Sequence, residues 1–150
     1  MEYHVEVVEN HEQRAAVVRG RVAHDGIPEF LGRAFGEALA AAGGEGGVAG
    51  PPFARYDVVP EGFDIEAGFP VSGGVAAGGG VEETTLPGGA AATTMHVGPY
   101  EELAGAYRAL EAWLGDNGRV PAGRPWESYL DDPDVAAPRT VVTWPCRPAS

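Results

Sequence analysis

Apolar residues in the first half of the chain follow two different spacings in turn. Strands are predicted at residues 3–8, 15–18, 53–58 and 63–71. Residues 3–8 and 63–71 alternate apolar and polar side chains, and residues 15–18 form a short apolar run between two arginines. Between the second and third of these strands, apolar residues recur three and four apart, which predicts an amphipathic helix over residues 27–42. Asp25 is placed to cap this helix, and Pro28 suits its first turn.

The second half repeats this order of strands and helix. Strands are predicted at residues 81–86, 91–97, 126–130 and 140–144, with an amphipathic helix over 100–114. The segment between the halves is nearly all glycine and alanine, which indicates a linker over residues 73–80. We therefore expect one domain, 1–150, that contains a ββαββ unit twice, over about 2–72 and 81–146.

A short motif supports the duplication. Pro52-Phe53-x-x-Tyr56 recurs as Pro125-Trp126-x-x-Tyr129. Each ββαββ unit leaves one face of its sheet uncovered, so the two halves should pack together. The predicted fold class is α+β, with a pseudo-two-fold pair of units and a central ligand cleft between them.

Charge and composition exclude several classes of protein. The chain has 22 acidic residues against 10 arginines and no lysine, with a net charge of -12. Nucleic-acid affinity depends largely on clustered basic residues, so we expect no nucleic-acid partner. No apolar run approaches the roughly 20 residues that span a bilayer, and the N-terminus lacks signal-peptide features, so we expect no membrane association and a cytoplasmic location. Cys146, the only cysteine, lies near the C-terminus and is not expected to be buried.

The strongest candidate for chemistry is Glu127. Side chains alternate along a strand, so Glu127 and Tyr129 should share one face, and Tyr56 occupies the equivalent position of Tyr129 in the first half. A carboxylate beside aromatic rings in an apolar groove suits a lipophilic cation. If desolvated, it could instead act as a general base. The alternative is that Glu127 is an exposed acid near the end of an edge strand.

The histidines predict no metal site. His4, His11, His24 and His96 show no ligand spacing, and no second cysteine joins them, so we expect neither a metal nor a cofactor. His96, on a predicted strand, is expected to be a half-exposed structural residue.

The duplicated pattern, together with two motifs, resembles a known family. The segment Met95-His96-Val97-Gly98-Pro99-Tyr100 leads into the second helix, and Trp126-Glu127-Ser128-Tyr129-Leu130-Asp131-Asp132-Pro133 covers the candidate acid. Over about residues 2–146 the chain is similar to the GyrI-like domain, the effector-binding domain of AraC-type and MerR-type multidrug regulators. That resemblance implies a pair of SHS2-like units with an aromatic cleft, in which Glu127 binds drug cations and Tyr56, Tyr129 and Trp144 line the site.

The resemblance leaves three functions open. The first is a stand-alone protein that binds hydrophobic, often cationic compounds, for sequestration, resistance or sensing, because the chain shows no helix-turn-helix module. The second is a hydrolase that opens cyclopropane-bearing toxins, with Glu127 activating water and Tyr129 or Tyr56 donating a proton. The third is an inhibitor that binds DNA gyrase. The natural ligand and the oligomeric state are left open.

Overall fold

The computed structural model describes residues 3–43, 47–75, 79–132 and 134–149. The chain forms two compact units, each with its own helix and antiparallel strands. We call residues Met1–His11 and Pro87–Ser150 unit 1, and residues Glu12–Leu86 unit 2. Neither helix in the described part of the chain is long and apolar enough to cross a membrane.

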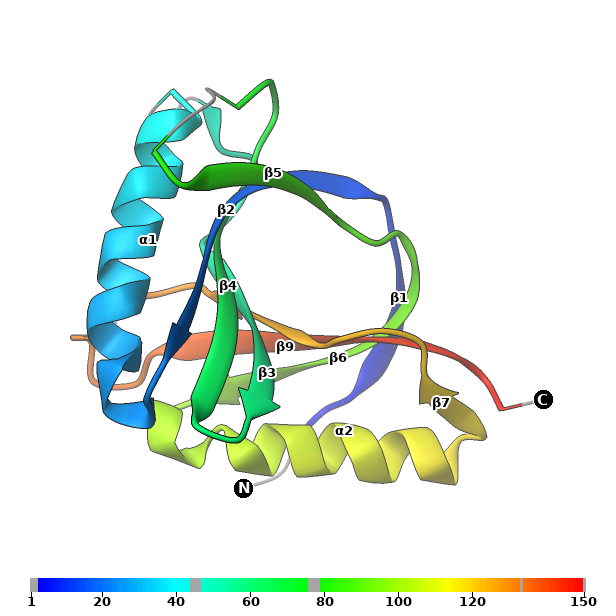
Figure 1. Cartoon of the computed structure of the whole chain (residues 1–150). Helices are drawn as coiled ribbons and strands as arrows, with labels where there is room; N and C mark the ends of the chain where they lie inside the picture. The colour runs from blue at the N-terminus through cyan, green and yellow to red at the C-terminus, as the bar shows by residue number, and fades with distance from the viewer. Residues whose placement is uncertain (1–2, 44–46, 76–78, 133, 150) are drawn as a thin grey trace. The chain divides into compact units, whose positions relative to one another are not determined.

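Unit 2 is an antiparallel sheet with one helix packed against it. Its strands are β2 (Gln13–Val22), β3 (Phe53–Val59), β4 (Gly62–Pro70) and β5 (Val81–Leu86), and they lie in the order β3-β4-β2-β5. The helix α1 (Ile27–Ala41) follows a short 3-10 turn, η1 (His24–Gly26), and runs beside β2 (Figure 1). Its apolar stripe is buried at Phe30, Ala34 and Ala38, as the three- and four-residue spacing predicts.

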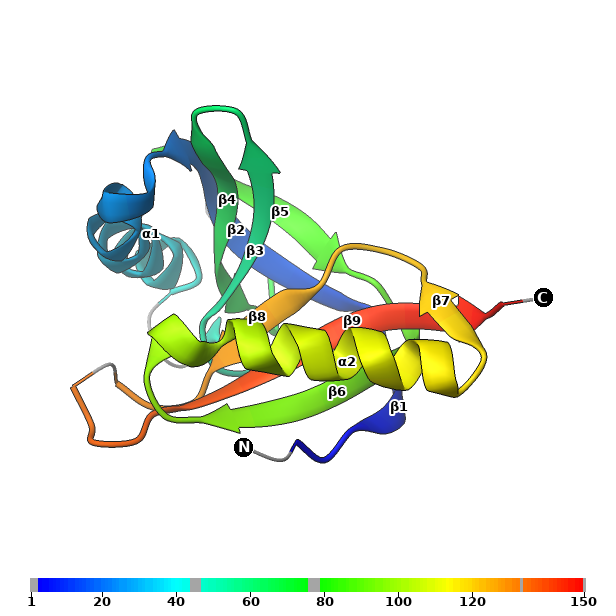
Figure 2. The same cartoon turned by 90° about the horizontal axis from the view of Figure 1, so that it is seen from below.

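Unit 1 has the same kinds of element. Its strands are β1 (Glu6–Asn10), β6 (Gly89–Val97), β9 (Arg139–Pro148) and β8 (Trp126–Tyr129), paired in that order, and the short β7 (Arg119–Pro121) also pairs with β9. The 3-10 turn η3 (Tyr100–Glu102) precedes the helix α2 (Ala104–Asp116). Figure 2 shows α2 lying across the strands of its own unit.

The core of unit 1 lies between α2 and one face of its sheet. Leu110 and Leu114 of α2 pack with Val142 and Cys146 of β9 in one buried cluster. The expectation that Cys146 is not buried is wrong, because β9 continues past Pro145 and carries the thiol into this core. Glu127 pairs with Val142 across β8 and β9, and directly opposed residues of antiparallel strands point to the same face. Glu127 therefore lies on the face that α2 covers.

The compact units do not coincide with the predicted repeats. The strand that opens the first repeat, β1, pairs with β6 of unit 1, whereas the strand that opens the second, β5, pairs with β2 of unit 2. The boundaries of the two units therefore differ from those of the predicted repeats, 2–72 and 81–146. Residues 76–78 of the predicted linker, and Pro133 of the second motif, lie outside the described residues. The pseudo-two-fold pairing, the cleft and the single-domain organisation stay predictions.

The helix boundaries follow the sequence signals with one exception. Pro28 lies in the first turn of α1, as predicted, but the residue that caps the helix is Gly26, with no side-chain hydrogen bond. The prediction that Asp25 caps α1 is wrong, because Asp25 belongs to the preceding 3-10 turn. Beyond the C-terminal ends of α1 and α2, Gly43 and Gly118 adopt φ values of 88° and 67°, which only glycine adopts without strain.

Candidate functional site

Glu127 is a buried carboxylate on β8. It is 7% exposed, so the alternative of an exposed acid is wrong. Two tyrosines donate hydrogen bonds to its two oxygens. The hydroxyl of Tyr107, on α2, lies 2.5 Å from Oε2, and the hydroxyl of Tyr129, on β8, lies 2.8 Å from Oε1. The second contact confirms that Glu127 and Tyr129 share a face, as strand alternation predicts.

Burial controls the protonation of this carboxyl. Desolvation raises the pKa of Glu127 above its ordinary value, because a charge is poorly accommodated away from water. Hydrogen bonds from Tyr107 and Tyr129 and the nearby His96 lower the pKa, but they do not cancel the effect of burial. Glu127 therefore keeps its proton to a higher pH than an ordinary glutamate, as a general base or an acid–base switch requires.

Aromatic rings extend from this carboxylate in two directions. Tyr100, in η3, packs edge-on against Tyr129 with ring centroids 5.8 Å apart. Tyr107 packs edge-on against Trp144 of β9 at 6.1 Å. Within unit 1, Tyr129 therefore contacts Glu127 directly, and Tyr107 links Glu127 to Trp144. Tyr56, the fourth predicted residue, lies in unit 2, where its ring contacts Phe63 at 6.3 Å; its role as a ligand contact stays a prediction.

His96 is fully buried, so the expectation of a half-exposed histidine is wrong. Its Nε2 lies 2.9 Å from the carbonyl oxygen of Pro99, and a carbonyl only accepts, so Nε2 carries the proton in this contact. Its Nδ1 lies 2.8 Å from the hydroxyl of Tyr3, which can donate a hydrogen bond to this nitrogen or accept one from it. Both ring nitrogens are therefore satisfied within unit 1, on the segment that leads into η3.

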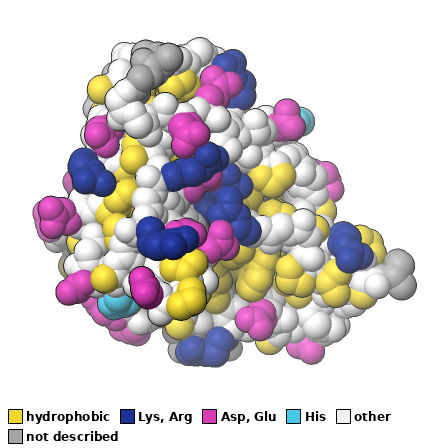
Figure 3. Space-filling view, in the orientation of Figure 1, with side chains coloured by type: hydrophobic (Ala, Val, Ile, Leu, Met, Phe, Trp, Pro, Cys, Tyr) yellow, Lys and Arg dark blue, Asp and Glu magenta, His cyan; other side chains and the backbone are white. Residues whose placement is uncertain are grey.

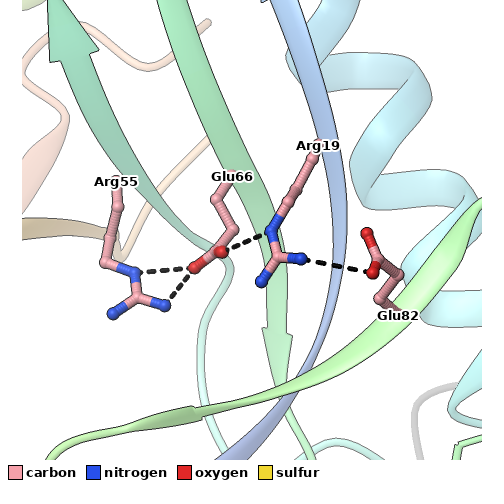
Figure 4. Close-up of polar contacts among 4 residues, drawn as sticks. All are labelled: Arg19, Arg55, Glu66 and Glu82. Carbon is pink, nitrogen blue, oxygen red and sulfur yellow. Dashed lines mark hydrogen bonds and ion pairs between the residues drawn. The ribbon is translucent and has the colours of Figure 1, made fainter.

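Unit 2 contains a second buried glutamate with a different environment (Figure 4). Glu66 of β4 is 4% exposed and accepts hydrogen bonds from Arg19 of β2, at 2.8 Å, and from Arg55 of β3. Burial favours the protonated form of Glu66, but the two arginines outweigh it and hold the pKa below its ordinary value. Figure 3 shows arginine and acidic side chains side by side over the strands of this unit. The chain thus compensates the buried charge of Glu66 with arginine, whereas Glu127 has hydroxyl partners.

The sequence pattern alone did not single out Tyr107 and Tyr100. Both lie in the apolar stripe that predicts the second helix, where a tyrosine is most simply a core residue. The available signal was their chemistry, because a buried tyrosine needs a hydrogen-bond partner for its hydroxyl. Tyr100 and Tyr107 are seven residues apart on one helical stripe, and the strand over 126–130 carries Glu127, an acid without a counterpart in the first repeat. Together these features would have indicated a hydrogen bond between a helix tyrosine and Glu127.

Comparison with known proteins identifies the family of this site. Residues 1–144 match the model of the GyrI-like small molecule binding domain. No curated protein matches the chain. The crystal structure of the EcmrR C-terminal domain is 25% identical with a TM-score of 0.81, and the match covers 99% of both chains. The chain spans 58% of the longer EcmrR chain in the EcmrR–DNA complex.

Two further structures share the fold at lower identity. A hydrolase from Listeria innocua is 14% identical with a TM-score of 0.72, over 95% of this chain and 91% of that one. SAV2435 bound to tetraphenylphosphonium is 12% identical with a TM-score of 0.62, over 98% and 94%. These two likenesses bear on the fold alone.

The family match over nearly the whole length, with a mixed α+β fold of antiparallel strands and helices, shows that the chain belongs to the GyrI-like family of small-molecule-binding domains.

Proposed function

We propose that the site around Glu127 binds a hydrophobic organic cation, with Glu127 as its charge partner. The observation that carries this proposal is the contrast between the two buried glutamates. Glu66 accepts hydrogen bonds from two arginines, whereas the hydrogen-bond donors to Glu127 among the described residues are tyrosyl hydroxyls. A buried charge without a counter-ion is unfavourable, and a bound cation would supply one.

The aromatic residues suit the rest of such a ligand. The ring face of tyrosine or tryptophan attracts a cation, by about 0.5–2 kcal/mol depending on desolvation. Tyr100, Tyr107, Tyr129 and Trp144 form a connected set around the carboxylate. A ligand with aromatic groups around a delocalised charge would contact these rings while its charge faces Glu127.

The hydrogen bonds to Glu127 set a condition for binding. Each carboxylate oxygen accepts a bond from a tyrosyl hydroxyl, and the site is buried. A cation that contacts Glu127 needs room beside the carboxylate, which movement of the Tyr107 or Tyr129 side chain would provide. Tyr107 is the one of the two that is only partly buried, so we propose that it moves first.

The direct test is the affinity for tetraphenylphosphonium, the ligand in the SAV2435 structure. Glu127→Gln keeps the shape of the side chain and removes its charge. Loss of a desolvated charge partner typically costs about 2–5 kcal/mol, so affinity should fall at least roughly tenfold. Glu111→Gln is the matched control, because it removes one acid from an exposed position of α2.

A neutral ligand separates charge recognition from packing. Triphenylphosphine oxide has similar aromatic groups without a net charge, so Glu127→Gln should change its affinity much less. Equal affinities of the parent and Glu127→Gln for tetraphenylphosphonium would overturn the proposal. So would an equal loss in Glu111→Gln.

A second candidate function is the hydrolysis of a strained ring. The observation that favours it is the contact of a carboxyl of raised pKa with tyrosyl hydroxyls at 2.5 and 2.8 Å. Glu127 would take a proton from water, the resulting hydroxide would attack the ring carbon, and a tyrosine would donate a proton to the carbon that leaves. Mass spectrometry of a cyclopropane panel should then show addition of water by the parent and none by Glu127→Gln.

The cellular role follows from which chemistry holds. Stoichiometric binding without turnover supports sequestration or sensing of toxic compounds, and turnover supports their breakdown. Inhibition of DNA gyrase stays a prediction, checked by a supercoiling assay without a small ligand.

A further inference from the structure

Thr140 is a buried hydroxyl without a protein partner. The side chain lies at the start of β9 and has no exposed surface. Among the residues that the structure describes, Thr140 Oγ1 is the buried side-chain polar atom with no hydrogen bond. Most buried polar atoms in folded proteins are hydrogen-bonded, so such a group needs an explanation.

The strand register places Thr140 beside the candidate site. Thr140 is directly opposite His96 of β6 on one side and Tyr129 of β8 on the other. Opposed residues of antiparallel strands point to the same face. The hydroxyl therefore lies on the face of unit 1 that carries Tyr129 and Glu127 and that α2 covers.

The neighbouring polar groups on this face already have partners. His96 uses both ring nitrogens, for Tyr3 and for the Pro99 carbonyl. Thr94, also buried on β6, donates to the carbonyl oxygen of His4 at 2.7 Å. The fold thus satisfies a comparable threonine on the same face of the same sheet. An unsatisfied buried hydroxyl is unfavourable, and valine would fill nearly the same space without that cost.

We propose that Thr140 is a specificity residue, whose hydroxyl forms a hydrogen bond with a polar atom of the bound cation. This inference rests on the proposed function of Glu127 and names the ligand class more narrowly. Glu127 and Thr140 are diagonal neighbours on the adjacent strands β8 and β9. Residues in this relation lie about 7–8 Å apart in antiparallel sheets. The matching ligand is a hydrophobic cation that carries a hydroxyl or carbonyl oxygen one ring away from its charged centre. An all-hydrocarbon cation would use Glu127 alone.

A matched pair of probes tests this assignment. Tetraphenylphosphonium and its analogue with one para-hydroxyl group have the same charge and nearly the same size. A net hydrogen bond is worth about 0.5–1.5 kcal/mol, so the parent should bind the hydroxylated cation about two- to twelvefold more tightly. Thr140→Val should bind both cations equally, at the affinity that the parent shows for tetraphenylphosphonium.

The variants distinguish failure of this inference from failure of the proposed function. Glu127→Gln should weaken both cations by the same factor and keep the preference for the hydroxyl. A preference that is unchanged in Thr140→Val, or absent in the parent, overturns the role of Thr140 and leaves that of Glu127 standing. If the parent binds neither phosphonium, both proposals fail together.

Thermal melting without ligand gives an independent reading. Thr140→Val should melt no lower than the parent, because the side chain loses no protein hydrogen bond. The matched variant Thr94→Val should melt lower, because it loses the bond to His4. A clear drop in the melting temperature of Thr140→Val would show that the hydroxyl is already satisfied in the ligand-free protein, and would overturn the inference.

Discussion

Replacing Tyr107 with phenylalanine should destabilise the protein in a pH-dependent way. The change removes one hydroxyl and keeps the ring that packs against Trp144. The lost hydroxyl donates to Glu127 Oε2 at 2.5 Å. When Glu127 is ionised, this is a hydrogen bond to a charge; when Glu127 is protonated, it is a bond between neutral groups. The free-energy cost of the substitution therefore depends on the state of Glu127.

The size of the effect follows from these two states. A hydrogen bond to a charged group contributes about 1.5–3 kcal/mol, and a neutral one contributes about 0.5–1.5 kcal/mol. The unfolding free energy of Tyr107→Phe should thus fall by the smaller amount in acid. It should fall by about 1 kcal/mol more once Glu127 ionises. Because burial raises the pKa of Glu127, this extra loss should appear above the pH at which an ordinary glutamate titrates.

The assay is urea unfolding of the parent and the variant over a series of pH values. Tyr100→Phe is the control, because Tyr100 packs against Tyr129 without a hydrogen bond to Glu127 in the structure. Its difference from the parent should not grow as Glu127 ionises. A Tyr107→Phe cost that stays constant across this range, or that shrinks as pH rises, would refute the reasoning about Glu127.

Two further predictions concern unit 2. Glu66→Gln should lower the unfolding free energy by roughly 3–5 kcal/mol at neutral pH in urea titrations, because it leaves the buried Arg55 without its carboxylate. Since the pKa of Glu66 is lowered, the parent's advantage should persist at neutral pH and disappear as pH falls through that pKa; an advantage that grows in acid would contradict the assignment. Gly68→Ala should lower stability by about 1–3 kcal/mol or prevent folding, because its Cβ would lie 1.8 Å from the carbonyl oxygen of Ala16. Gly36→Ala, with no heavy atom within 4 Å of the new Cβ, should unfold at nearly the same urea concentration as the parent, whereas Gly68→Ala should unfold at a lower one.

The elements of the fold were largely predictable from the sequence, because their periodicities are clear. The exceptions have local causes. The strand β7 has only three residues, too few to show an alternation. The strand β9 runs through Pro145 and Pro148, although proline usually argues against a strand. The order of elements did not predict that β1 pairs within unit 1 and β5 within unit 2. Strand pairing depends on contacts between residues far apart in the sequence.

The candidate site was predictable only in part. Alternation along a strand placed Glu127 and Tyr129 on one face, and the hydrogen bond between them agrees. Burial of Glu127 and its contact with Tyr107 depend on how α2 packs on the sheet, which helical periodicity does not specify to the level of one hydroxyl. The same limit applies to His96, whose strand position allowed a half-exposed side chain although the fold buries it completely.

The central claim is that a bound cation pairs with the ionised carboxylate of Glu127. Its most direct test is calorimetric titration of tetraphenylphosphonium into the parent and into Glu127→Gln, from about pH 4 to pH 8, in buffers of different ionisation enthalpy. In the parent, affinity should fall as pH falls through the raised pKa of Glu127, and in that range binding should release a proton to the buffer. Binding to Glu127→Gln should be weaker, independent of pH, and without proton release. Identical pH profiles for the two proteins would contradict the claim.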